Sequence, residues 1–287
     1  MLTLKQRRSL LRIIFAGSLT ILTIASFLRV FFPQYSLYSV HNSKLDKVNS
    51  LNKSFNSTLG FDHIYVINLA KRPDRLRVMK TMTDALGLEV EFFTAVSTDD
   101  HKTLNRFNNS TYLKDTHKAC YISHYLIYAS IVSRGYDSAL ILEDDVDIEL
   151  NITSIMSYIH SVLPNDWDLL YLGHCMNWEG SFFEPLDDSS PIFKLYPSKK
   201  PYCTHAYAVS YAGALKLLKE LSVLEVPVDL ELISRIDDGI VTSYSIEPAI
   251  VVQWRSDDNP SDVSPDAELE HKTLLNSTLN SLGFSWK

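Results

Sequence analysis

The sequence has no excess of basic charge. Its 287 residues contain 27 Lys and Arg against 34 Asp and Glu, and no basic stripe with interleaved aromatic residues occurs. Proteins that bind polyanions normally carry such a stripe. We therefore expect no nucleic-acid partner.

The sequence also lacks internal repeats and low-complexity blocks. Its length and its 46% of hydrophobic residues suffice for one substantial core, but not for two full catalytic domains. We expect a single globular domain.

Cysteine is scarce and odd in number, with Cys120, Cys175 and Cys203. In an oxidising compartment two of the three are expected to pair. We favour Cys175 with Cys203, because both lie in loop-like stretches that flank one variable segment, although spacing does not determine the pairing. Cys120 lies in an apolar helical pattern and is predicted to be a buried thiol.

The amino terminus carries four basic residues between Lys5 and Arg12, followed by an apolar run over residues 13–32. This pattern predicts a cytoplasmic tail over 1–12 and a transmembrane signal-anchor over 13–32. A signal peptide cleaved near Ala25 is the alternative, but the apolar core of such peptides is only about 7–15 residues long. We favour a retained anchor in the type II orientation.

The rest of the chain is then luminal. Residues 33–60 are rich in Ser, Asn and Lys, which is typical of a flexible stem. Chance gives about two or three Asn-x-Ser/Thr sequons at this composition. The chain has six, which begin at Asn52, Asn56, Asn108, Asn109, Asn151 and Asn276. We expect a Golgi or endoplasmic reticulum membrane protein with a luminal catalytic domain over 61–287.

Strand-like and helical segments alternate through this domain. Apolar, β-branched runs predict strands over 63–69, 90–96, 138–142, 168–172 and 206–210. Helical periodicity predicts helices over 73–86, 118–134, 152–163 and 212–221, the first two ended by Gly87 and Gly135. This alternation predicts an α/β fold with a mainly parallel sheet.

An acidic triplet, Glu143-Asp144-Asp145, directly follows the strand over 138–142. Ligands of open α/β sheets bind at the carboxyl ends of strands. Adjacent carboxylates there suit a hard cation such as Mn²⁺ or Mg²⁺. If the chain stays extended, the first and third acids point one way and Asp144 the other. The alternative is a solvent-exposed acidic turn, which the nearby Asp147 and Glu149 favour.

Further polar residues follow the strand over 63–69. Asn68, Lys71, Arg72, Asp74 and Arg75 come after the first strand, where they could contact phosphate or base, or be ordinary exposed side chains of a helix start.

Four more positions carry side chains that can bind a ligand or transfer a proton. Ser123 and His124 lie near the start of the helix over 118–134, where free amides can face a ligand, although His124 alone favours a structural role. His205 is a candidate metal ligand or a core histidine. Asp229 is a candidate base.

Several motifs in this order resemble glycosyltransferase family 25. They are TyrValIleAsnLeu with Arg72-x-Asp74-Arg75, Cys120-x-x-Ser123-His124, LeuIleLeuGluAspAspVal, TrpAspLeuLeuTyrLeuGly and ThrHisAlaTyrAlaValSer. The resemblance runs from about Phe61 to Glu247. It implies a GT-A-type nucleotide-sugar-binding fold and an inverting hexosyl transfer, usually from UDP-galactose, assisted by a divalent cation.

The resemblance also implies roles for residues. Glu143 and Asp145, with His205, would bind Mn²⁺ or Mg²⁺, and Asp144 the donor ribose. The nucleotide pocket would be bordered by Asn68, Arg72, Arg75, Ser123 and His124. An inverting transfer also needs a base, for which Asp229 is our candidate, with Glu231, Asp237 and Asp238 as competitors.

The acceptor is expected to be a glycan or glycoprotein. Two other functions stay open. The first is transfer from another nucleotide-sugar, because nothing in the motifs selects galactose. The second is a non-catalytic luminal carbohydrate-binding or scaffold protein, which the intact acidic triplet argues against.

Overall fold

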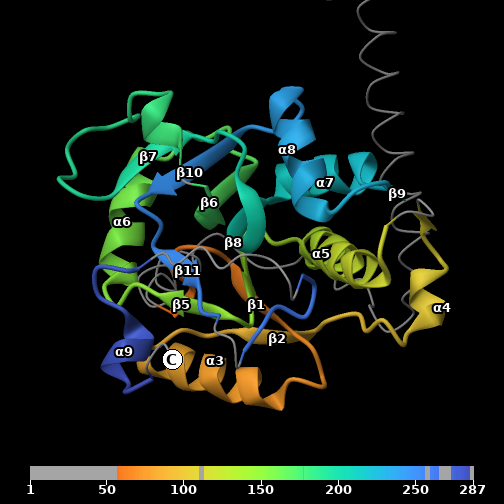
Figure 1. Cartoon of the computed structure of the whole chain (residues 1–287). Helices are drawn as coiled ribbons and strands as arrows, with labels where there is room; N and C mark the ends of the chain where they lie inside the picture. The colour runs from red at the N-terminus through yellow and green to blue at the C-terminus, as the bar shows by residue number, and fades with distance from the viewer. Residues whose placement is uncertain (1–56, 110–112, 177, 256–258, 265–272, 285–287) are drawn as a thin grey trace, which may run out of the picture. The chain divides into compact units, whose positions relative to one another are not determined.

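A computed structural model describes residues 57–109, 113–176, 178–255, 259–264 and 273–284 (Figure 1). The expected cytoplasmic tail, the signal-anchor and nearly all of the stem lie outside these ranges. Among the helices within them, none combines the length and apolar character of a membrane span.

A seven-stranded sheet in the order β2-β1-β4-β8-β6-β10-β7 forms the centre of the domain (Figure 1). Its strands are β1 His63–Asn68, β2 Glu91–Thr94, β4 Ser138–Glu143, β6 Leu169–Cys175, β7 Lys194–Pro197, β8 Tyr202–Ser210 and β10 Ser243–Glu247. All but β7 and β8 run in the same direction. The expected α/β fold with a mainly parallel sheet is confirmed.

Shorter elements complete the described chain. Two small sheets pair β5 Val146–Ile148 with β11 Val251–Gln253, and β3 Asn108–Asn109 with β9 Val223–Leu224. The helices are α3 Pro73–Ala85, α4 His101–Leu104, α5 Asp115–Arg134, α6 Ile152–Val162, α7 Tyr211–Glu220, α8 Val228–Asp237 and α9 Thr278–Ser281, with a 3-10 turn, η1 Glu179–Ser181.

The apolar periodicity explains why the helices flank the sheet. On one face, α3 and α6 bury residues such as Met79, Met82, Met156 and Ile159 against alternate residues of β1, β4, β6 and β8. The opposite face carries α5, which packs against α7 and α8. The sheet therefore lies between two helical layers.

Tyrosines fill the layer between the sheet and α5. The Tyr65 hydroxyl of β1 hydrogen-bonds with Ser130 at 2.9 Å, and the Tyr207 hydroxyl of β8 hydrogen-bonds with Tyr128 at 2.5 Å. Tyr171 of β6 stacks on Tyr207 with ring centroids 5.5 Å apart. All four tyrosines are completely buried, so polar hydroxyls lie inside this part of the core.

Two features differ from the sequence prediction. The strand β8 is longer than expected and antiparallel to both neighbours, β4 and β6. A parallel strand needs a long crossover connection, usually a helix, whereas the chain between β6 and β8 contains only η1 and β7 in its described part. The strands β7 and β10 of this sheet were not predicted, because their LysLeuTyrPro and SerTyrSerIleGlu sequences are short and contain few apolar residues.

Gly173 allows β6 to approach β11 closely, which gives the first prediction. A Cβ atom there would lie 1.8 Å from the Val251 carbonyl oxygen and 2.7 Å from His205 Nε2. We expect Gly173→Ala to lower the free energy of unfolding by about 1–3 kcal/mol or more, because backbone must move. Denaturant unfolding measures this.

The control is Gly180→Ala, where the added Cβ meets only side-chain atoms at 3.0 Å and beyond. Its effect should stay within about 0.5 kcal/mol. Equal stabilities of the two variants would contradict the close approach.

Candidate active site

The strand pair β1–β4 brings two polar motifs to one edge of the sheet. The strands are parallel, and Ile67 lies opposite Glu143. Asn68 and Asp144 therefore follow at the same edge, where Asn68 Nδ2 donates a hydrogen bond of 2.7 Å to Asp144 Oδ2. This confirms that the carboxyl ends of neighbouring strands meet there.

The acidic triplet is not a solvent-exposed turn. Asp144 is 9% exposed and Asp145 is 3% exposed. Arg75 Nη1 donates to Asp144 Oδ1 at 2.9 Å, and Arg255 Nε donates to Asp145 Oδ2 at 2.8 Å. Two buried carboxylates are thus each paired with a guanidinium group.

The following acids have a structural role. Asp147 and Glu149 are both 1% exposed. Asp147 Oδ1 accepts a hydrogen bond from the Leu279 backbone N–H at 3.1 Å, and Glu149 Oε1 accepts one from the Asn276 N–H at 2.8 Å. They hold the α9 segment against β5, so they are not evidence for a solvated turn.

The alternative of exposed helix-start side chains is wrong for Arg75. This side chain is buried, and it also donates to Asn259 Oδ1 at 2.9 Å and to the Pro260 carbonyl at 2.7 Å. Arg72 bonds Asn259 as well, at 2.5 Å, and Asp262 at 2.6 Å.

The segment 259–264 therefore belongs to the site. It lies beside the arginines that follow β1, because its amide and carboxylate oxygens accept their hydrogen bonds.

Burial and the neighbouring cationic groups shift the carboxyl pKa values of the triplet in opposite directions. Burial, together with the neighbouring charge of Asp145, raises the pKa of Asp144, which Arg75 only partly offsets. Burial also opposes ionisation of Glu143, but His124 and the Arg255 guanidinium outweigh it and lower the pKa of Glu143. Glu143 is therefore an anion at neutral pH.

Two adjoining pockets open at this edge. The first, the triplet pocket, is lined by Glu143, Asp144 and Asp145 together with Lys71, Arg75, Ser123 and His124. The second, the Asp229 pocket, is lined by Asp229, His117, Thr204 and Gln253. Five lining residues are common to both: Cys120, Glu143, Arg255, Ser261 and Val263. Glu143, the first acid of the triplet, thus lies at the junction of the two pockets.

Two of the three predicted metal ligands offer oxygen atoms to the triplet pocket. Asp145 Oδ1 is buried and has no hydrogen-bond partner among the described residues. Glu143 Oε1 accepts a hydrogen bond from Thr204 Oγ1 at 2.9 Å. A carboxylate oxygen without a partner, such as Asp145 Oδ1, fits a hard divalent cation.

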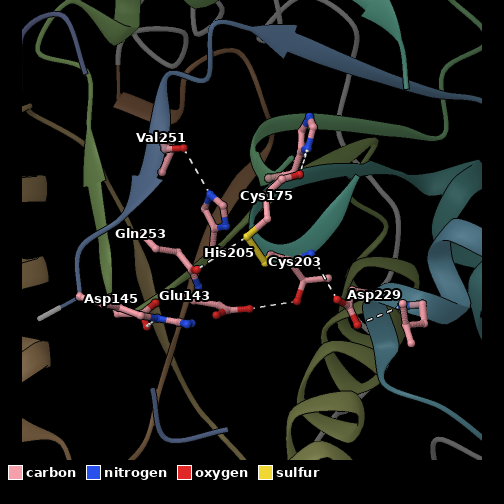
Figure 2. Close-up of a disulfide and its surroundings, with 12 residues drawn as sticks. Glu143, Asp145, Cys175, Cys203, His205, Asp229, Val251 and Gln253 are labelled. Carbon is pink, nitrogen blue, oxygen red and sulfur yellow. Dashed lines mark hydrogen bonds and ion pairs between the residues drawn. A yellow bond between two sulfur atoms is a disulfide. The ribbon is translucent and has the colours of Figure 1, made fainter. Parts of the chain in front are cut away.

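The third predicted ligand, His205, lies apart from the pockets. It lines neither of them, and its Nε2 donates a hydrogen bond to the Val251 carbonyl at 3.3 Å (Figure 2). Burial lowers the pKa of His205 to about 3, so its ring is neutral. Some residues of the described chain bring three possible metal-ligand atoms within 4.8 Å of one another. Glu143, Asp145 and His205 do not form such a group.

Ser123 and His124 line the triplet pocket, but they are not at a helix start. The helix α5 begins at Asp115, so the amides of both residues lie within the helix. The Ser123 hydroxyl donates to the Ala119 carbonyl at 2.7 Å and accepts from the Val96 N–H at 2.9 Å. The expected presentation of free amides to a ligand is therefore wrong.

Asp229 is the acid of α8 that faces a pocket. Its oxygens accept hydrogen bonds from the Cys203 N–H at 3.2 Å and the Leu230 N–H at 3.0 Å (Figure 2). Of its competitors, Glu231 is buried and paired with Arg235 at 3.1 Å. Asp237 and Asp238 are exposed and line neither pocket.

The expected disulfide is confirmed and lies beside Asp229. Cys175 and Cys203 are joined (Figure 2). The partly buried Cys120 is a free thiol. Because Cys203 also donates its N–H to Asp229, the disulfide holds one wall of the Asp229 pocket.

Sequence reasoning missed Arg255 as a site residue. It follows the short strand β11, and it lies at the junction of the two pockets because β11 pairs with β5 directly after the triplet. The apolar run IleValValGlnTrp before this arginine was the available signal.

Comparison with known proteins decides the family. The family model described as Glycosyltransferase family 25 (LPS biosynthesis protein) matches residues 61–232, more than half of the chain. The chain belongs to glycosyltransferase family 25. The matched range contains the triplet and Asp229, whereas Arg255 and the 259–264 segment of this family member lie beyond it.

Similar proteins carry related names. A glycosyltransferase 25 family member of Aedes aegypti is 31% identical over 206 residues, which cover 66% of this chain and 33% of the relative. Procollagen galactosyltransferase 1 of Danio rerio is 31% identical over 183 residues, 56% of this chain and 29% of the relative. A Bos taurus relative with the same identity and coverage is named "Probable inactive glycosyltransferase 25 family member 3". The aligned part of this family 25 chain spans about a third of these relatives.

The pairing of Arg75 gives a second prediction. We expect Arg75→Met to lower the free energy of unfolding by about 3–5 kcal/mol, because it leaves Asp144 buried beside Asp145 without its cation. Thermal or denaturant unfolding of the variant checks this.

The matched control is Arg77→Met, an exposed arginine two residues further along α3. Surface substitutions of this kind change stability by about 0.5 kcal/mol at most. If both variants lost the same stability, the buried ion pair would not be what Arg75 contributes.

Proposed function

We propose that this protein is a hexosyltransferase that moves galactose from UDP-galactose to a glycan or glycoprotein acceptor, with inversion and with divalent-metal assistance. The observation that carries the proposal is the pair of adjoining pockets that share Glu143 and Arg255. One pocket contains the acidic triplet and the other contains Asp229, so a donor and an acceptor would meet at their junction. Family membership supports transfer, and the name of the Danio rerio relative supports galactose.

The triplet pocket is the proposed donor site. Asn68 and Arg75 hold Asp144 in place to bind the donor ribose, and Lys71 lines the pocket that would hold the nucleotide. Arg72 lines neither pocket and hydrogen-bonds with Asn259 and Asp262, so its contact with the nucleotide stays a prediction from the family resemblance. Glu143 and Asp145 supply the oxygen ligands for Mn²⁺ or Mg²⁺, which when bound neutralises the charge of the leaving diphosphate. Arg255 adds a guanidinium at the junction, where that charge develops. Ligation by His205 remains a prediction from the family resemblance.

The Asp229 pocket is the proposed acceptor site. Two backbone N–H groups orient the Asp229 carboxylate, and each of its oxygens keeps a lone pair. Asp229 would take the proton of the acceptor hydroxyl as this hydroxyl attacks the anomeric carbon from the side opposite the diphosphate.

We also propose a luminal, type II membrane location in the Golgi or endoplasmic reticulum. The basic residues followed by an apolar run at the amino terminus support it, as do the six sequons. The Cys175–Cys203 disulfide adds support, because such bonds persist in oxidising compartments.

One observation favours a second candidate, a non-catalytic carbohydrate-binding protein. The Bos taurus relative named as inactive matches this chain as well as the Danio rerio galactosyltransferase does. A donor assay with the full chain in detergent, across a panel of nucleotide-sugars with Mn²⁺ or chelator, separates the candidates.

We expect UDP release from UDP-galactose that needs the metal, and a loss of at least about 100-fold in Asp145→Asn, because one metal oxygen is removed. The exposed Asp84→Asn serves as control. Release from a different donor would identify another transferase. If no donor is hydrolysed or bound, the non-catalytic candidate holds.

The base assignment gives a further prediction. Asp229→Asn should lower kcat for transfer by about 10²–10⁴-fold with little change in donor affinity, because a positioned base contributes about this factor. Asp237→Asn, at the exposed end of the same helix, should keep full activity. Steady-state kinetics of both variants are the measurement, and unchanged turnover in Asp229→Asn would disprove the assignment.

A further inference from the structure

A thiol, an imidazole and a carboxylate converge at the junction of the two pockets. The ligand atoms of Cys120, His124 and Glu143 all lie within 4.8 Å of one another. Cys120 and His124 lie one turn apart on the same face of α5, and Glu143 ends β4. Cys120 and Glu143 line both pockets and His124 lines the triplet pocket, so an ion in solution can reach the group.

The imidazole is already held in the orientation of a metal ligand. His124 Nδ1 shares a hydrogen bond of 2.8 Å with the Tyr207 hydroxyl, which in turn bonds Tyr128. The other ring nitrogen, Nε2, lies 3.6 Å from Glu143 Oε1. Histidines that bind metals almost always have their second nitrogen fixed by such a partner.

We propose that Cys120, His124 and Glu143 form a binding site for a thiophilic divalent cation of the Zn²⁺ type, with a fourth position open to the pockets. Zn²⁺ takes sulfur, nitrogen and oxygen ligands at about 2.0–2.3 Å in a tetrahedral arrangement, so ligand atoms lie roughly 3.3–3.8 Å apart. The ligand atoms lie within 4.8 Å of one another, so they need to approach by about 1 Å at most when the metal binds. The thiol releases its proton to the solvent when the metal binds.

This site differs in chemistry from the proposed donor-metal site. Soft sulfur and imidazole ligands select Zn²⁺, whereas the carboxylates of the triplet suit Mn²⁺ or Mg²⁺. The two sites share Glu143, so Zn²⁺ bound to Cys120 withdraws a ligand from the donor metal and occupies the junction. If the proposed donor-metal site holds, we therefore expect Zn²⁺ to inhibit transfer by competing with Mn²⁺.

The test measures binding directly and does not require turnover. Full-length protein in detergent is titrated with Zn²⁺ by calorimetry, and with Co²⁺ by absorption, where a thiolate-to-cobalt charge-transfer band reports a sulfur ligand. We expect one equivalent to bind and to produce this band. Cys120→Ala should abolish the band and weaken Zn²⁺ binding at least about 100-fold, because one of three ligands is lost.

Asp145→Asn separates this inference from the proposed function. It removes a ligand of the proposed donor metal but none of the thiol site, so it should retain the cobalt band and the Zn²⁺ affinity even if the protein proves inactive. Absence of the band in the unmodified protein, or Zn²⁺ affinity unaffected by Cys120→Ala, would overturn the proposal.

A matched pair of tyrosine variants tests the orientation of His124. Tyr207→Phe should weaken Zn²⁺ binding by about 10–100-fold, the usual effect of losing the partner of a metal-binding histidine. Tyr171→Phe is the control, because the Tyr171 hydroxyl is equally buried but has no hydrogen-bond partner among the described residues. Equal affinities of the two variants would contradict the orienting role of Tyr207.

Discussion

The site depends on the neutralisation of buried negative charge. Asp144 and Asp145 lie side by side with little access to water, and each is paired with an arginine. A buried carboxylate without a partner is strongly destabilising. Arg75 comes from α3 near the start of the domain and Arg255 from the end of β11, so the ion pairs join distant parts of the chain at one edge of the sheet.

This arrangement also explains how binding could rearrange the site. The guanidinium of Arg255 occupies one Asp145 oxygen and leaves the other without a partner among the described residues. A divalent cation would take over part of the charge compensation that the arginines now provide. Glu143 lines both pockets and belongs to both proposed metal sites. Which cation Glu143 binds would therefore determine whether the junction holds the donor metal or Zn²⁺.

Local patterns were sufficient for the first half of the fold. The apolar periodicities of β1, α3 and β4 arise from residues close in sequence, and glycines with positive φ at 87 and 135 end the helices as expected. The triplet could be placed at the edge of the sheet for the same reason, because the strand before it is continuous and apolar. The sequence could not show that Asp144 and Asp145 are buried.

The sequence by itself determined the family, the alternation of strands and helices and the acidic triplet, since these depend on short motifs in a fixed order. Only the tertiary structure decided the antiparallel direction of β8, the position of Arg255 and the convergence of Cys120, His124 and Glu143. Each of these depends on contacts between residues far apart in the chain. Such contacts are selected by the packing of the whole domain, which local periodicity does not encode.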